Sequence, residues 1–113
     1  MASQKDVMLL AQLIEATKQG RVSWQPTANF DEFTTSFRGR FSVVVSRSRD
    51  GFLLRMFDES DREMVRLDED AYWLETLLGA NERVELHELF ELARRSALNV
   101  DQAIDDVLHE LRG

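Results

Sequence analysis

The sequence predicts an α+β domain in which helices cover one face of an antiparallel sheet. Three observations support this class: an amphipathic helical pattern near the N-terminus, a central run of alternating residues broken by turns, and two amphipathic patterns near the C-terminus. We expect an N-terminal helix, a meander of four or five antiparallel strands, and two C-terminal helices packed on one face. With 113 residues the chain is long enough for one core, so we expect residues 1–113 to form a single α+β domain.

The N-terminal helix is expected to begin after Ser3 and to end before Gly20. Serine is a favourable N-cap residue, and a glycine after the last turn suits the left-handed conformation in which many helices end. The apolar stripe of this helix consists of Val7, Leu10, Ala11 and Ile14.

The middle of the chain alternates apolar and polar residues with a period of two, as strands with one buried face do. A short extended piece is expected at residues 22–24, because Pro26 cannot continue a central ladder. Asp50–Gly51 is typical of a tight hairpin turn, and turns are also expected at Gly39 and at residues 58–61. The other expected strands span residues 33–38, 41–46, 52–57 and 62–67.

Two amphipathic helices are expected at the C-terminus. The first has an apolar face that includes Leu89 and Phe90, and the second carries a stripe from Val100 to Leu111. Asn99 and Gln102 have the spacing of a capping box, which would start the second helix. Its stripe is expected to pack on the sheet or on the Leu89 and Phe90 face of the preceding helix, which would make the last helix integral to the domain.

The predicted core draws on all of these elements, whereas residues 68–82 fit either a short helix or an exposed loop. Truncation after Leu98 is expected to unfold the domain, because it would remove four large core side chains. The expected core residues are Leu10, Ile14, Trp24, Phe37, Phe41, Val43, Val45, Leu54, Met56, Leu89, Phe90, Ile104, Val107, Leu108 and Leu111.

Composition excludes several classes of function. The formal net charge is −7, which disfavours binding to nucleic acid or to an anionic membrane surface. The chain has no cysteine, so disulfides, thiol nucleophiles and zinc–thiolate sites are excluded. No apolar run approaches the length of a membrane span and no signal-peptide pattern begins the chain, so we expect a cytoplasmic protein.

Catalytic and metal-binding motifs were sought around the two histidines. The stretch from His87 to Glu91 resembles a zinc-protease helix, but that motif needs a second histidine where Glu91 stands. The sequence therefore predicts no catalytic, metal-binding or cofactor-binding residue and no cofactor. A small hydrolase or metal-dependent enzyme that uses His87 or His109 with nearby acids is kept as an alternative.

Two groups of residues in the strands are candidates for partner binding. Arg38 and Arg55 are expected on strand faces, where they would form a site for an anion or acidic peptide, pair with the acidic helices of the same chain, or simply solubilise the outer face of the sheet. Val44, Leu53 and Phe57 fall on the face opposite the core and are too apolar for a fully solvated surface. We therefore expect a homodimer that uses this face or an edge strand.

Aromatic residues give two further expectations. Trp24 is expected to fill one end of the core. Tyr72 and Trp73 lie in an irregular acidic stretch and fit either the core or an exposed anchor at an interface.

Two resemblances follow from longer stretches. Thr17, Gly20 and Trp24 after the first helix, with the leucine-rich ending from Leu89 to Leu111, resemble a widespread type of small bacterial α+β protein with no settled function. This resemblance spans most of the chain, implies an N-terminal helix, a β meander and a C-terminal helix pair, and transfers no catalytic residue. In size and acidity the chain is also similar to small acidic type III secretion chaperones, which bind partner peptides along their surface.

The sequence thus favours a non-enzymatic protein-interaction module that associates with itself and with an unidentified protein partner. A secretion-type chaperone for an effector peptide is the first alternative, and the histidine-dependent enzyme is the second.

Overall fold

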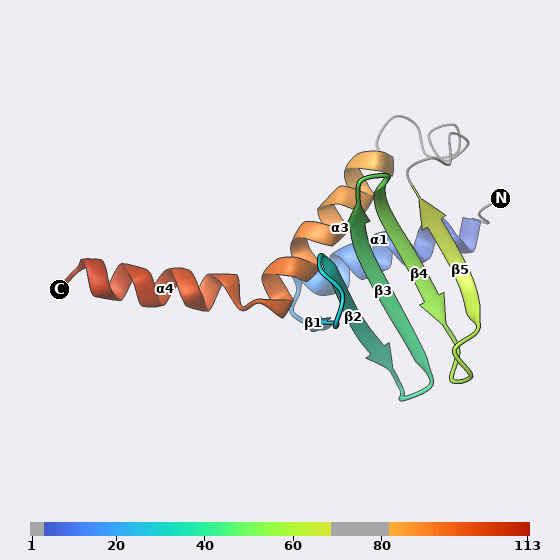
Figure 1. Cartoon of the computed structure of the whole chain (residues 1–113), viewed down its shortest axis with the longest axis horizontal. Helices are drawn as coiled ribbons and strands as arrows, with labels where there is room; N and C mark the ends of the chain where they lie inside the picture. Colours follow the sequence, from blue (N-terminus) through green and yellow to red (C-terminus); the bar gives the residue numbers. More distant parts are fainter. Residues whose placement is uncertain (1–3, 69–81) are drawn as a thin grey trace.

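The computed structural model describes residues 4–68 and 82–113 and confirms the α+β class. Helix α1 (Gln4–Lys18) precedes a five-stranded sheet, which is followed by helices α3 (Glu82–Ala97) and α4 (Val100–Leu111) (Figure 1). The sequence fits either a helix or a loop for residues 68–82, and of these only Asp68 and Glu82 are among the described residues. The strands are β1 (Gln25–Pro26), β2 (Glu32–Phe37), β3 (Phe41–Ser48), β4 (Gly51–Phe57) and β5 (Glu63–Asp68).

The sheet is an antiparallel meander in the order β1-β2-β3-β4-β5. Its register aligns Phe33, Val45, Leu54 and Leu67 in one row across four strands. All four side chains are buried, because α1 and α3 cover this inner face. The β3–β4 hairpin closes on the pair Ser48 and Gly51, so the turn expected at Asp50–Gly51 is confirmed within one residue.

The first strand differs from the expectation. Residues 22–24 do not form it; Gln25 and Pro26 do, by pairing with Thr34 and Phe33. Proline is tolerated there because β1 is an edge strand, where no neighbour needs its missing N–H.

The core lies between the sheet and the helix pair α1 and α3. Phe90 of α3 is fully buried, and its ring centroid lies 5.6 Å from that of Phe33 and 5.3 Å from that of Phe52. At the rim, Lys18 Nζ of α1 lies 2.7 Å from Glu88 Oε1 of α3. The hydrogen bond and charge of Glu88 raise the pKa of Lys18 above its ordinary value.

Trp24 closes one end of this core, as expected. Its side chain is buried, and its Nε1 donates to Thr17 Oγ1 at 3.0 Å. Thr17 in turn donates to the carbonyl oxygen of Leu13 at 2.7 Å, and the backbone N–H of Trp24 donates to Ser96 Oγ at 3.0 Å. The loop after α1 is therefore tied to both helices that cover the sheet.

Helix α4 does not join the core, so its expected packing on the sheet or on α3 is wrong. None of its residues is buried, and it runs away from the rest of the domain (Figure 1). The molecule is consequently 54 Å long, against 34 and 27 Å in its other dimensions. Four expected core side chains are instead exposed: Ile104 by 45%, Val107 by 58%, Leu108 by 41% and Leu111 by 77%.

The joint between α3 and α4 explains this direction. Leu98 and Asn99 separate the helices, and Asn99 adopts a left-handed conformation with φ 50°. An N-cap residue needs an extended backbone to reach the first turn, so Asn99 makes no side-chain cap hydrogen bond. The expected capping box is wrong for this reason, and Gln102 Nε2 donates instead to Asp106 Oδ1 at 3.0 Å.

The rest of the expected core is largely confirmed. Phe37, Phe41 and Met56 are only partly buried. The core also contains buried residues outside the expected list, namely Leu13, Phe33, Leu67, Leu86 and Ala93. None of the helices in the described part of the chain is long and apolar enough to cross a bilayer.

Candidate interaction surfaces

Helix α4 presents an exposed apolar stripe on an acidic helix. Leu98, 48% exposed, extends the stripe back into the joint. The helix sequence VDQAIDDVLHEL contains four acids and no lysine or arginine. A helix of 12 residues is marginal in water when nothing packs against it. A contiguous exposed apolar stripe with a polar rim is typical of a protein interface.

The root of α4, by which we mean its first turn and the end of α3 beside it, is polar. The guanidinium of Arg95, near the end of α3, pairs with the carboxylate of Asp101 in the first turn of α4. A hollow of about 440 Å³ lies beside this pair, and Ser23 and Gln25 of the loop and β1 form its other side. The apolar stripe therefore begins where the domain surface is hydrophilic, and nothing in residues 4–68 and 82–113 buries it.

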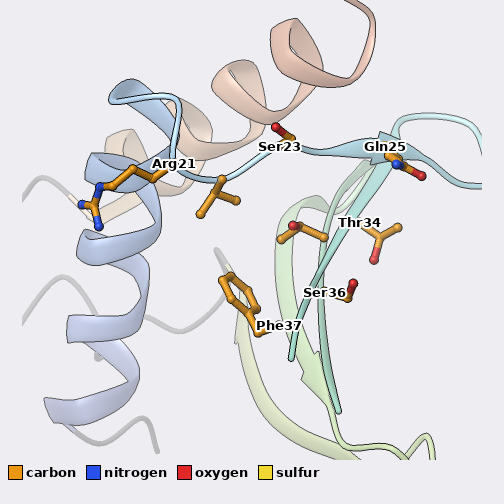
Figure 2. Close-up of a pocket in the computed structure, with 8 residues that line it drawn as sticks. Arg21, Ser23, Gln25, Thr34, Ser36 and Phe37 are labelled. Carbon is orange, nitrogen blue, oxygen red and sulfur yellow. The ribbon is translucent and has the colours of Figure 1, made fainter. Parts of the chain in front are cut away.

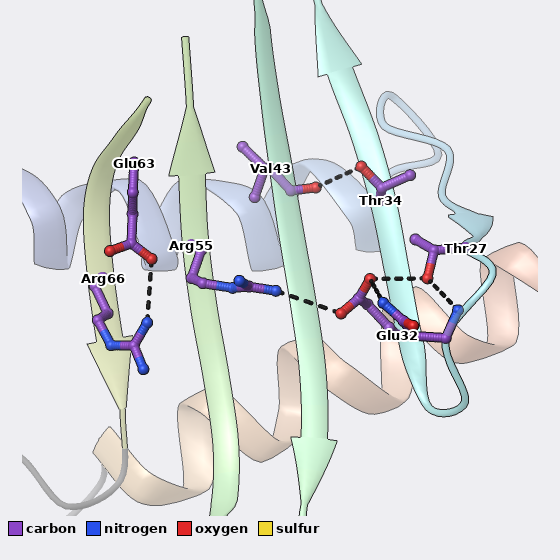
Figure 3. Close-up of polar contacts among 8 residues, drawn as sticks. Thr27, Glu32, Thr34, Val43, Arg55, Glu63 and Arg66 are labelled. Atoms are coloured by element: carbon purple, nitrogen blue, oxygen red, sulfur yellow. Dashed lines mark hydrogen bonds and ion pairs between the residues drawn. The ribbon is translucent and has the colours of Figure 1, made fainter. Parts of the chain in front are cut away.

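The outer face of the sheet holds the apolar residues expected there. Val44, Leu53 and Phe57 share this face by register, and each is half-buried. Arg55 reaches across β3 from β4, and its Nη2 lies 3.3 Å from Glu32 Oε2 on β2 (Figure 3). The Arg55 guanidinium also lies 5.3 Å from the centroid of the Phe57 ring. Its Nε is buried without a hydrogen-bond partner among the described residues.

Further polar contacts hold this ion pair in place. Glu32 Oε1 accepts hydrogen bonds from Thr27 Oγ1 at 2.8 Å and from Asn29 Nδ2 at 3.0 Å. On the neighbouring strand, Arg66 Nη1 pairs with Glu63 Oε1 at 3.1 Å (Figure 3). Both arginines of the outer face are thus neutralised within the sheet.

The arginines do not form a continuous basic stripe. Arg38 lies in the β2–β3 turn with φ 57°, so its expected place on a strand face is wrong, because Phe37 and Phe41 already close the hairpin. Arg47 shares its row with Phe52 on the inner face, where it lies 5.1 Å from the Phe90 ring and pairs with Asp31 at 2.8 Å. Of the two arginines expected to bind a partner, Arg55 instead pairs within the chain, with Glu32 of the sheet rather than with a helix, and the role of Arg38 stays a prediction.

The two histidines are both exposed. His87 packs on Phe52 with ring centroids 5.0 Å apart and the rings tilted by 47°, and its Nε2 lies 3.9 Å from Glu91 Oε1. His109 lies on α4, far along the helix that leaves the domain. In residues 4–68 and 82–113, no three histidine or carboxylate side chains gather as a metal site would require.

Tyr72 and Trp73 lie outside the described residues, so their expected role in the core or at an interface stays a prediction.

A groove between α1 and β2 is a surface that the sequence did not indicate. We call it the α1–β2 groove, and Figure 2 shows Phe37 pointing into it from the end of β2. One stretch, of about 450 Å³, runs along β2 beside Arg21, Val22, Ser23 and Gln25. The other, of about 320 Å³, lies along α1 over Leu9, Gln12, Leu13 and Ala16, and shares Arg21, Val22 and Phe37 with the first. Since three separate segments form it, no local pattern could have identified it.

Comparison of the chain with protein-family models, with curated proteins and with solved structures finds no match. The resemblances to small bacterial α+β proteins and to secretion chaperones therefore stay predictions.

Proposed function

We propose that this chain is a non-enzymatic protein-interaction module whose binding element is helix α4. The observation that carries the proposal is the exposed stripe of Ile104, Val107, Leu108 and Leu111 on a helix with no buried residue. An amphipathic helix that presents such a stripe binds by laying its apolar face into a groove of a partner.

The domain supports this role as a scaffold. Its core of sheet, α1 and α3 is complete without α4, so the helix is available for binding without loss of the fold. In this proposal His87 packs on Phe52 and has no catalytic task, and the protein acts in the cytoplasm, where self-association remains part of its function.

The first test is truncation after Leu98. Residues 1–98 are expected to melt within a few degrees of the full chain at low micromolar concentration, because the core loses no buried side chain. This reverses the expectation from sequence. Circular dichroism decides the point, and an unfolded fragment would contradict the proposal.

The second test compares binding by variants of α4. Val107→Gln with Leu111→Gln removes half of the stripe while keeping good helix-forming residues. Asp105→Asn with His109→Gln, on the polar face, is the matched control. Affinity capture from the native cell should recover a partner with the full chain and the control but not with the stripe variant. Equal recovery by all three would place binding on another surface.

A further inference from the structure

The part of the α1–β2 groove next to α1 is lined by apolar residues, of which Leu13 and Ala16 are themselves almost fully buried. Leu9, Leu13 and Ala16 line its α1 side, and Val22 and Phe37 face them. The groove runs beyond these residues along β2, where serine and threonine side chains replace the apolar ones. Helix α4, of 12 residues and about 18 Å, is an amphipathic helix of the kind that binds by laying its apolar face into a groove.

Charge also matches between the two surfaces. No aspartate or glutamate is present among the described residues that line the groove, and Arg21 lines both of its stretches. Lys5 and Asp6 both lie about one turn before Leu9 on α1, so their charges offset there, and the basic edge of the groove comes from Arg21 and from Arg38, which directly follows Phe37. Helix α4 carries four acids and no basic residue other than His109. An acidic apolar helix and a basic-edged apolar groove are electrostatically complementary.

The position of the groove favours a second copy of the chain as the source of the helix. Ser23 and Gln25 line both the groove and the hollow at the root of α4. The helix thus begins beside one end of its own groove but runs away from it (Figure 1). A two-fold axis near this root would carry each helix onto the groove of the other copy, and such an isologous exchange closes as a dimer.

We infer that α4 of one copy binds in the α1–β2 groove of a second copy, and that the exchange is reciprocal. This inference rests on the proposed function, in which α4 is the binding element, and it names the partner as the chain itself.

Two other pairings are less compatible with the charges. Direct pairing of α4 with its symmetry mate would place two helices of four acids each side by side, and like charges repel. Docking of α4 on the outer sheet face would meet Arg55 and Arg66, which Glu32 and Glu63 already neutralise.

The test uses three full-length variants and measures mass by sedimentation equilibrium. Val107→Gln with Leu111→Gln is the helix variant, and Gln12→Glu with Arg21→Glu, both exposed, is the groove variant. Arg49→Glu, in the β3–β4 turn, is the control for charge reversal outside the groove. Circular dichroism verifies that each variant is folded.

The full chain and the control should form a dimer at tens of micromolar. The helix variant should weaken the dimer by at least about a hundredfold, since each docking site loses two large aliphatic side chains. The groove variant should weaken it by at least about tenfold through repulsion of the acidic helix.

Mixing the two weakened variants provides the decisive measurement. In a mixed dimer, the intact helix of the groove variant meets the intact groove of the helix variant, so one of two docking sites is restored. The mixture should therefore associate more tightly than either variant alone. Helix-to-helix pairing predicts no such rescue, and a groove variant that dimerises like the full chain overturns the inference.

Two outcomes separate this inference from the proposed function. A full chain that stays monomeric at these concentrations overturns reciprocal exchange, whether α4 is free or folded back into its own groove. If the full chain nevertheless captures another protein through the α4 stripe, the proposed function stands alone. If α4 mediates neither association, both fail.

Discussion

Helix α3 and helix α4 follow one another with only Leu98 and Asn99 between them, yet α3 forms the centre of the core and α4 has no buried residue. Both are amphipathic, and α4 separates apolar from polar residues more strongly than α3 does. Amphipathicity therefore shows that a helix needs a partner surface but not where that surface lies.

The width of the sheet explains which helix is left out. Five strands about 4.8 Å apart span roughly 19 Å, and two helices of about 10 Å each cover that width. Helices α1 and α3 occupy the inner face, with Leu10, Leu13 and Phe90 among their buried residues. Most of the inner face is therefore covered, and the apolar surface left beside α1 is the α1–β2 groove, so α4 presents its stripe to the outside.

The largest contrast is expected between Phe90→Ala and Leu108→Ala. Phe90 is fully buried between two rings of the sheet, so its truncation should lower the free energy of unfolding by about 3–5 kcal/mol. Leu108 is 41% exposed on α4, and its truncation should change stability by no more than about 0.5 kcal/mol. Urea denaturation at low micromolar concentration, where exchange dimers are scarce, measures both. A Leu108 effect as large as that of Phe90 would mean that α4 is part of the core after all.

A smaller contrast is expected between hydrogen bonds on the two helices. Ser96→Ala on α3 removes the acceptor for the backbone N–H of Trp24, which should cost about 1–3 kcal/mol if that donor stays unpaired. Gln102→Ala on α4 breaks an exposed bond to Asp106 and should cost only a few tenths of a kcal/mol. The same denaturation assay compares them. Equal costs would show that α3 is no better anchored at its end than α4 is.

The sequence predicted the elements well because each has a local signal. Alternation placed the strands of residues 32–68 within two residues, and turn residues such as Gly39 and Asp50 marked their ends. The stripe of α4 was also identified correctly as apolar. The position of α4 was not predicted correctly. That position depends on how much of the inner sheet face α1 and α3 leave uncovered, which is a property of the assembled layers.

The candidate surfaces were predictable only in part. Val44, Leu53 and Phe57 follow from alternation, and the register confirms that they share the outer face. Arg38 was misplaced by one position, since alternation continues through the end of β2 without showing where the hairpin turns. The α1–β2 groove brings together residues from α1, the following loop and β2, and such a surface has no signature in any one segment.

The smallest effect on stability is expected at the joint that separates the two helices. Asn99 has φ 50°, a conformation that glycine adopts readily and asparagine tolerates. Asn99→Gly should change the free energy of unfolding by less than about 0.5 kcal/mol, because no side chain of α4 is buried and the Arg95–Asp101 ion pair across this joint is exposed. Its effect should appear in the direction of α4, since glycine allows many more backbone conformations than asparagine does.

The chain has no cysteine, so spin labels on Arg38→Cys and Glu110→Cys report a single distance. In the monomeric background of Val107→Gln with Leu111→Gln, the distance distribution should broaden when Asn99 is replaced by glycine. Equal widths with asparagine and glycine would show that the joint does not set the direction of α4, and that its position outside the core depends on the sheet and its two covering helices alone.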